Sequence, residues 1–441
     1  MSITDNSGRN NITTAGWTSP PNLRGTTDIL FSCILTIFLC CWVTVCVNVP
    51  PPESGFWIRL KHKGLVFFET LSGPEFIFHT ALTQYLAARN SVVGFEKAGY
   101  KGWTIKHGFF CNAAGFRLRP PDFVSFPVDM SQIHYLVCHG YIDYEEVCLD
   151  LEAIADRNKS DGLSRTITSA QLMWFLINII ARLASGLCIT TLGLSTCAFI
   201  FCALPTYLVW RHKPHDVSRS IELVPKNNKT MTDILTEAGP IAALPYEYTP
   251  LDFVRCQQHC FGVMWTHFMN RMMPRYLGIR LHPSKRPIDK IWDDVFGKLS
   301  RLPHALLSFV QIGFVAIHLT AWNFYFPTKV ENFLWRLSAL YAVCSVVFAW
   351  IFFVIGFEVW PRIKQASQRK NPWGQDQEKQ AWRTILPPRP PAILFCIAIP
   401  LALVNFAARA YILVEDIISL RSLPTSAYDT VQWSAFLPHF S

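Results

Sequence analysis

Long apolar runs interrupt a polar background along this chain of 441 residues. A helix needs about 20 apolar residues to cross the hydrocarbon core of a bilayer while it satisfies its own backbone hydrogen bonds. Four runs reach this length without an Asp, Glu, Lys or Arg: Ile29 to Val49, Cys188 to Trp210, Pro303 to Trp322 and Leu337 to Phe357.

Two further runs are long enough, although each carries one arginine near an end. They are Ile167 to Leu187 with Arg182, and Pro391 to Val414 with Arg409. An arginine in such a position either reaches the membrane interface or pairs with an acid. The pattern predicts an all-α fold, a polytopic helical integral membrane protein with six strong transmembrane helices.

The stretch 64–88 is a weak or broken seventh helix. It contains Ser72-Gly73-Pro74-Glu75, whose spacing predicts a capping box in which the Ser72 hydroxyl accepts from the Glu75 N–H and the Glu75 carboxylate accepts from the Ser72 N–H. Pro74 suits the first turn of a helix, where a backbone N–H would have no hydrogen-bond partner within the helix. We expect a break at Ser72 to Pro74, and the sequence leaves open whether 64–88 crosses the bilayer.

Composition supports the membrane assignment. Hydrophobic residues make up 51% of the chain and charged residues only 16%, whereas a soluble domain carries about 25% charge. The net charge of +9 fits loops that face a membrane better than it fits nucleic acid, so no nucleic-acid partner is expected. Nine of the 14 cysteines fall inside the apolar runs, where a thiol packs as a small apolar group, so we expect no disulfide framework.

The chain divides by hydropathy into four parts. These are a polar, disordered leader (1–28), an N-terminal membrane part (29–210) with a cytoplasm-proximal insert (89–166), a cytoplasmic segment (211–302) with an interfacial helix (250–277), and a C-terminal membrane part with three helices (303–441). We find no nucleotide, haem or phosphate-loop motif, and therefore expect neither a cofactor nor a metal.

Loop charge predicts the orientation, because Lys and Arg accumulate in cytoplasmic loops. Segment 361–390 carries seven Lys or Arg and segment 211–302 carries 14, whereas one follows Leu420. Both segments are therefore expected inside and the C-terminus on the non-cytoplasmic side. The N-terminus lies inside if 64–88 spans the membrane and outside if it does not.

Ionisable residues inside apolar segments are the candidates for chemistry. Glu75 and His79 are spaced i and i+4 on one helix face, and ionisable groups at membrane depth tend to line cavities or to pair with each other. We expect Glu75 to act as an acid or base with His79 as its partner, and Glu69 and His318 as secondary candidates. Capping and packing are the structural alternative for Glu75.

Five segments resemble one largely uncharacterised family of fungal multi-pass membrane proteins. They are RGTTDILFSCILTIFLCCWVTVCVNVP (24–50), SGPEFIFHTALTQY (72–85), TIKHGFFCNAAGFRL (104–118), DRNKSDGLSRTITSAQLMWFLINIIAR (156–182) and VWRHKPHDV (209–217). The resemblance implies a multi-pass membrane protein with an exposed N-terminus, and it carries no established chemistry.

We therefore expect an integral-membrane enzyme of the endoplasmic reticulum or another endomembrane. Buried ionisable groups without a redox or nucleotide motif suit acid/base chemistry on a lipophilic small molecule, such as cyclisation or isomerisation. The resemblance to fungal membrane proteins associates this activity with specialised metabolism. The alternative is a non-enzymatic membrane transporter or a sensor-like scaffold. Besides the lipid bilayer, the sequence identifies no protein partner.

Overall fold

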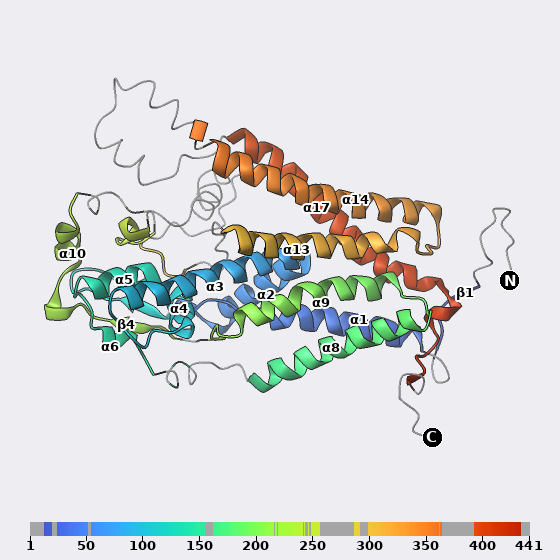
Figure 1. Ribbon diagram of the computed structural model, residues 1–441, viewed down its shortest axis with the longest axis horizontal. Coiled ribbons are helices and arrows are strands. Elements are labelled where there is room, and N and C mark those ends of the chain that lie inside the picture. The colour runs from blue at the N-terminus through green and yellow to red at the C-terminus, as the bar shows by residue number, and fades with distance from the viewer. Residues whose placement is uncertain are drawn as a thin grey trace.

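The computed structural model describes residues 13–19, 24–51, 54–150, 152, 154, 162–215, 217, 219–240, 242, 246, 248–255, 286–291, 299–360, 362–363 and 392–433. Most of the described chain is helical (Figure 1). Its long helices are α1 (Thr26–Val43), α2 (Phe56–Ser72), α3 (Pro74–Lys97), α8 (Gly162–Ala184), α9 (Thr191–Trp210), α13 (Arg301–Leu319), α14 (Lys329–Val354) and α17 (Ala392–Ile418).

Six of these helices, α1, α8, α9, α13, α14 and α17, are long and apolar enough to cross a bilayer. Each coincides with one of the six predicted strong spans. The largest shift is at α14, which begins at Lys329 rather than near Leu337. A capping box explains the earlier start, because the Glu331 N–H donates to the Thr328 hydroxyl (3.2 Å) and the Glu331 carboxylate accepts from the Thr328 N–H (3.1 Å).

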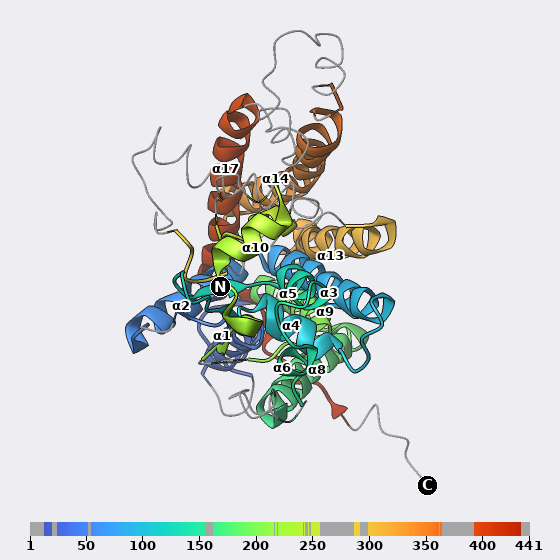
Figure 2. The ribbon, with the colours of Figure 1, turned by 90° about the vertical axis from the view of Figure 1, so that its left-hand side faces the viewer.

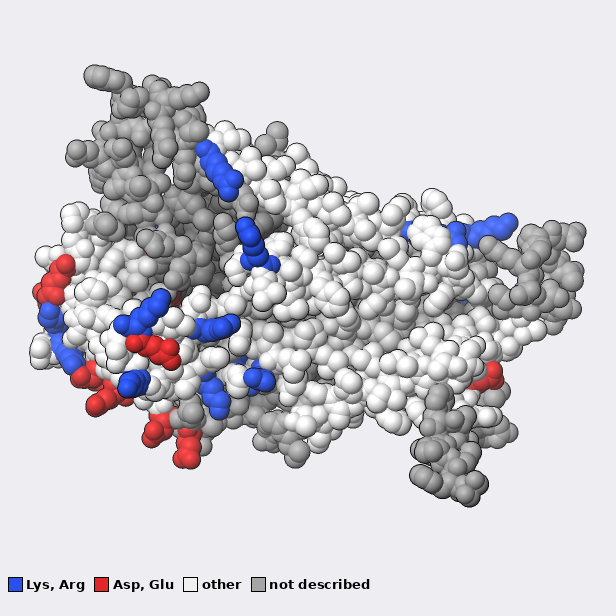
Figure 3. All heavy atoms as spheres, viewed as in Figure 1, with Lys and Arg blue, Asp and Glu red and all other residues white. Residues whose placement is uncertain are grey.

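The helices form one bundle around α9, which packs against α1, α3, α8, α13 and α17. Helices α14 and α17 pack along each other, and α14 also packs against α13; in the end-on view of Figure 2 this pair rises from one side of the bundle. The outward side of the bundle is apolar, with exposed Phe31, Trp174, Phe309, Phe333 and Leu403. On the face seen in Figure 3, the described charged residues gather towards the two ends and leave the middle uncharged.

The weak seventh candidate is a hairpin of two helices, and neither is among the six long apolar ones. Helix α2 ends at Ser72 and α3 begins at Pro74, with the extended residue Gly73 between them. The predicted break at Ser72 to Pro74 is therefore confirmed. Figure 2 shows α2 projecting sideways from the bundle, and its outer residues Phe56 and Trp57 are highly exposed.

A compact region, which we call the end domain, lies at one end of the bundle (Figure 1). Its elements are α4 (Ile105–Asn112), β2 (Phe116–Leu118), β3 (Phe126–Val128), α5 (Met130–Cys138), α6 (Tyr144–Val147), β4 (Ile221–Leu223) and α10 (Met231–Ala238). A three-stranded sheet of order β3-β2-β4 joins the two chain segments, and β2 pairs with β4 in parallel. Fully buried Phe95, Phe110, Phe116 and Ile133 belong to one core. The all-α prediction is therefore correct for the bundle and wrong for this small sheet.

The opposite end holds both chain ends that the structure describes. Strand β1 (Thr14–Ala15) pairs antiparallel with β5 (Leu423–Pro424), so part of the predicted leader is a strand. The buried Arg182 guanidinium donates to the carbonyl oxygens of Cys188, Ser426, Ala427 and Asp429 at 2.7–3.1 Å. These bonds fasten the segment after α17 to the end of α8.

Candidate functional site

Glu75 and Arg409 form an ion pair inside the bundle. Arg409 Nη1 donates to Glu75 Oε2 at 3.1 Å, and Nη2 contacts Glu75 Oε1. Glu75 is 2% exposed and Arg409 9%. The contact is bidentate, the geometry in which a guanidinium binds a carboxylate most strongly.

The tip of the α2–α3 hairpin brings this pair together. Glu75 lies in the first turn of α3, and Arg409 Nη1 also donates to the carbonyl oxygen of Ser72 at 2.9 Å, at the end of α2. Gly73 allows the close approach, because a Cβ there would meet the Phe76 ring and lie 3.4 Å from Arg409 Nη1. One arginine of α17 therefore binds both arms of the hairpin.

The expected capping box is wrong. The Ser72 hydroxyl donates to the Phe68 carbonyl at 2.7 Å, and the Glu75 carboxylate accepts from Arg409 instead of the Ser72 N–H. A charged partner forms stronger hydrogen bonds than a backbone N–H. The tertiary contact therefore replaces the local one that the sequence suggested.

His318, a secondary candidate from the sequence, lies next to this pair. The Arg409 guanidinium sits 5.2 Å from the centroid of the Phe314 ring, and the Phe314 and His318 rings are 4.9 Å apart. His318 Nδ1–H donates to the Phe314 carbonyl at 2.9 Å and the residue is 5% exposed. Glu75, Arg409, Phe314 and His318 thus form one buried cluster, which we call the ion-pair cluster.

The other two candidates lie on the hairpin with less burial. His79 follows Glu75 by one turn of α3, and Glu69 is in the last turn of α2; both are half-buried. The structure therefore places all four candidates in one region. Both oxygens of Glu75 are engaged by Arg409, so Glu75 is arranged here as a hydrogen-bond acceptor rather than as a proton donor.

Burying the two charges of the Glu75–Arg409 pair has a free-energy cost that only the intact pair offsets. Taking two charges out of water carries a penalty of several kcal/mol for each ion, which the bidentate contact offsets. Removing one partner leaves the other charge buried and unpaired, which destabilises by about 3–5 kcal/mol. The pair therefore makes the position of the hairpin strongly dependent on both residues.

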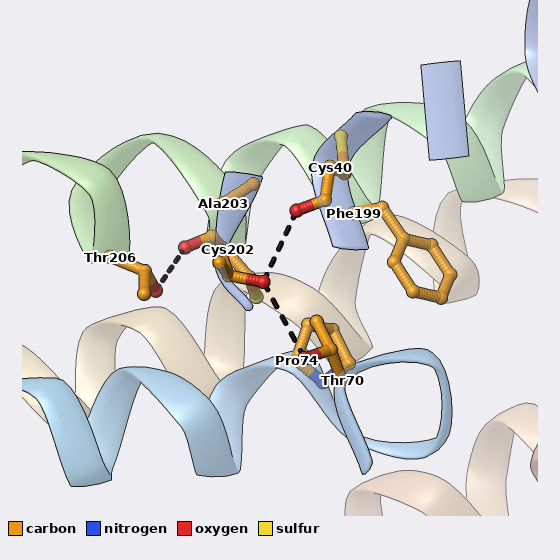
Figure 4. A pocket seen from close by; sticks show the side chains of 8 residues that line it. Cys40, Thr70, Pro74, Phe199, Cys202, Ala203 and Thr206 are labelled. Carbon is orange, nitrogen blue, oxygen red and sulfur yellow. Dashed lines mark hydrogen bonds between the residues drawn. The ribbon is translucent and has the colours of Figure 1, made fainter. Parts of the chain in front are cut away.

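A small recess adjoins the hairpin tip, between α1 and α9 (Figure 4). Within it the Thr206 hydroxyl donates to the Cys202 carbonyl at 2.8 Å, and the Thr44 hydroxyl lies 3.5 Å from that of Thr70. The recess leaves no room for a water molecule. It is lined by Cys40, Thr44, Thr70, Pro74, Phe199, Cys202, Ala203 and Thr206.

No metal centre is formed by the residues that the structure describes, where no group of three or more His, Cys, Asp or Glu side chains has a suitable arrangement. The predicted interfacial helix 250–277 lies outside the described residues from position 256 onwards, and Asp252–Arg255 form a short 3-10 helix. The loop 361–390, apart from residues 362 and 363, is also outside them.

Sequence reasoning missed Phe314 and the carbonyl oxygen of Ser72 as parts of the cluster. Phe314 gave no signal, since an aromatic residue in an apolar run is expected to pack. Arg409 did give one, because an arginine in one apolar run and a glutamate in another are candidates for pairing.

Comparison with known proteins identifies a family without a described activity. The family model described as "Family of unknown function (DUF8562)" matches residues 1–141, 147–257 and 300–440. No curated protein and no solved structure matches the chain. Because the match covers well over half of the sequence, the chain belongs to this family of unknown function.

Proposed function

We propose that the chain is a multi-pass membrane protein with six transmembrane helices. The six long apolar helices and the uncharged middle of the surface in Figure 3 support this proposal. Because β1 pairs with β5, both described chain ends lie on one side, and the α2–α3 hairpin then dips into the bilayer without crossing it. Loop charge puts the end domain in the cytoplasm and the chain ends on the other side.

For its role we propose a sensor-like scaffold, in which the state of the ion-pair cluster controls the end domain. One observation carries this proposal: α3 is a single 24-residue helix that runs from the Glu75–Arg409 pair to the core of the end domain. Its length is about 36 Å at 1.5 Å per residue. Phe95, which follows Glu75 by 20 residues on the same helix, is fully buried in that core.

The proposed role requires two states of the pair, formed and broken. Formed, it holds the start of α3 against α17; broken, it leaves a buried charge that favours movement of the hairpin towards water. A packed helix transmits such a displacement because its side chains have few alternative arrangements. Ser91 and Ala88 of α3 contact Gly108 of α4 so closely that a Cβ on Gly108 would lie 2.8–3.0 Å from them.

Amide hydrogen exchange of the full chain in lipid nanodiscs tests this role. Glu75→Gln keeps the size of the side chain and removes its charge, and Glu69→Gln, on the other arm of the hairpin, is the matched control. We expect Glu75→Gln to raise exchange in α4 and α5, and Glu69→Gln to leave it unchanged. Exchange that rises only around residues 72–82 and 405–412 would contradict the proposal.

An acid/base enzyme is the second proposal, and His318 is the observation that favours it. An imidazole buried beside an ion pair suits proton transfer to a lipophilic molecule, for example in cyclisation or isomerisation at an endomembrane of a fungal cell. Small-molecule extracts of host membranes with wild-type protein or with His318→Gln test it. A metabolite that depends on His318, with equal expression and thermal stability of the two proteins, would favour the enzyme over the scaffold.

Transport is the other non-enzymatic role. Transporters commonly use pairs of discontinuous helices. In the described chain, α9 and α17 remain continuous through Pro205 and Pro400, and α2–α3 is the broken element. The scaffold role therefore accounts for more of the fold.

A further inference from the structure

Another buried acid, Asp416, lies two turns beyond Arg409 on α17, next to the buried Glu415. Asp416 is completely buried, and neither of its carboxylate oxygens has a hydrogen-bond partner of good geometry within the described part of the chain. Glu75, by contrast, has both oxygens bound by Arg409. The ion-pair cluster therefore does not explain how the buried carboxyl group of Asp416 is stabilised.

Hydroxyl groups of α9 face this carboxyl. Ser195 and Thr191 are near enough to interact with it, and Ser195 is completely buried. The Ser195 Oγ also has no hydrogen-bond partner among the described residues. The Thr191 and Ser419 hydroxyls are 3.0 Å apart, and Ser419 Oγ donates to the Asp416 carbonyl at 3.2 Å.

Among the residues that the structure describes, the titratable neighbours of Asp416 do not neutralise it. They are the thiol of Cys33 on α1 and the adjacent Glu415, whose Oε2 accepts from the Tyr411 hydroxyl at 3.2 Å. Neither supplies a positive charge. A carboxylate buried without a positive partner is strongly disfavoured unless a cation or a proton joins it.

We propose that Asp416, Ser195 and Thr191 bind a monovalent metal cation such as Na⁺. Hard cations take oxygen ligands, and this site offers a carboxylate and uncharged hydroxyls. A single carboxylate balances one positive charge, whereas Ca²⁺ sites gather several carboxylates. A proton competes with Na⁺ for the same carboxylate, so Na⁺ binds more tightly at higher pH.

The proposed cation site connects α9 with the end of α17, and its proposed ligands belong to these two helices alone. It does not depend on the scaffold role, because α3 contributes none of its residues. Occupancy would neutralise Asp416 and hold α17 against α9 on the side of the bundle where β1 and β5 pair. A ligand that binds only the folded state raises the melting temperature with the logarithm of its concentration.

Thermal unfolding of the full chain in nanodiscs at pH 8 tests the proposal, with NaCl exchanged for choline chloride at constant ionic strength. The variants are Asp416→Asn, which removes the charge, and Ser195→Ala, which removes an uncharged ligand. Thr196→Val is the matched control, because this completely buried neighbour donates its hydroxyl to the Leu192 carbonyl of its own helix at 2.7 Å.

We expect the melting temperature of the wild type and of Thr196→Val to rise with the Na⁺ concentration. Asp416→Asn should melt at a temperature independent of Na⁺, and Ser195→Ala should need a several-fold higher concentration for the same rise. A wild-type melting temperature independent of Na⁺ at pH 8 would overturn the proposal and leave Asp416 a protonated acid. An undiminished Na⁺ effect in Asp416→Asn would also overturn it.

Discussion

Glu75 and Phe95 occupy opposite ends of the same helix, α3, and both are buried, one in an ion pair with Arg409 and the other in the core of the end domain. A change at either residue therefore acts on one rigid element. This relationship is the basis of the scaffold role, and it makes the contacts at the hairpin tip open to direct tests.

Breaking the Glu75–Arg409 pair on one side should destabilise the fold more than replacing both partners. We expect Arg409→Met alone to lower the free energy of unfolding by about 3–5 kcal/mol, because it leaves a buried carboxylate unpaired. Glu75→Leu combined with Arg409→Met should recover most of this loss, since the double variant buries no charge. Denaturant unfolding of the wild type, the two single variants and the double variant gives a double-mutant cycle. A loss of stability in the double variant that equals the sum of the two single losses would contradict the pairing.

Gly73 should tolerate no side chain. A Cβ at this position would meet the Phe76 ring next to Arg409, and overpacking of this kind costs about 1–3 kcal/mol. Gly64, in the middle of α2, is the matched control, because no heavy atom lies within 4 Å of a Cβ placed there. We expect Gly73→Ala to lower the melting temperature and Gly64→Ala to leave it unchanged or raise it, because alanine favours a helix over glycine.

Lowering the pH should reduce the folding stability of the end domain, because His107 becomes protonated. This residue is 2% exposed; its Nδ1 accepts from the Thr104 N–H at 3.1 Å and its Nε2–H donates to the Leu149 carbonyl at 2.7 Å. Burial lowers the pKa of His107, and the Leu149 carbonyl opposes that shift. The unfolded chain therefore binds the proton more readily, so stability is constant above a pH of about 6.5 and falls below it, by up to about 1.4 kcal/mol per pH unit until the folded group titrates.

His107→Gln isolates this effect. Glutamine at the third helical position can still accept from the Thr104 N–H, but it does not titrate. Melting temperatures at pH 7.5 and 5.5 provide the comparison. The wild type should lose more stability on acidification than His107→Gln, and equal losses would show that another group is responsible.

Local sequence information determined some parts of this fold and not others. The six long helices were predictable because each apolar run is long enough to indicate a helix by itself. Arg409 could be predicted to pair with an acid, but not with Glu75 in particular, because the two lie 334 residues apart and Ser72 offered Glu75 a local alternative with the right spacing. The sheet was missed because its strands are three residues long and β2, which ends at Leu118, pairs with β4, which begins only at Ile221. His318 was predicted as a secondary candidate, and its contact with Phe314 places it in the cluster.

Whether the ion pair acts on the end domain through α3 is tested most directly by interrupting that helix. Arg89 and Asn90 are exposed and precede Gly94 and Phe95, which contact His134 of α5. Two glycines there weaken the helix by about 1 kcal/mol each. The measurement is amide exchange in α5 for the wild type, Glu75→Gln, Arg89→Gly with Asn90→Gly, and the triple variant. The account predicts that Glu75→Gln raises exchange in α5 of the intact helix and has little effect once α3 is interrupted; the same rise in both backgrounds would contradict it.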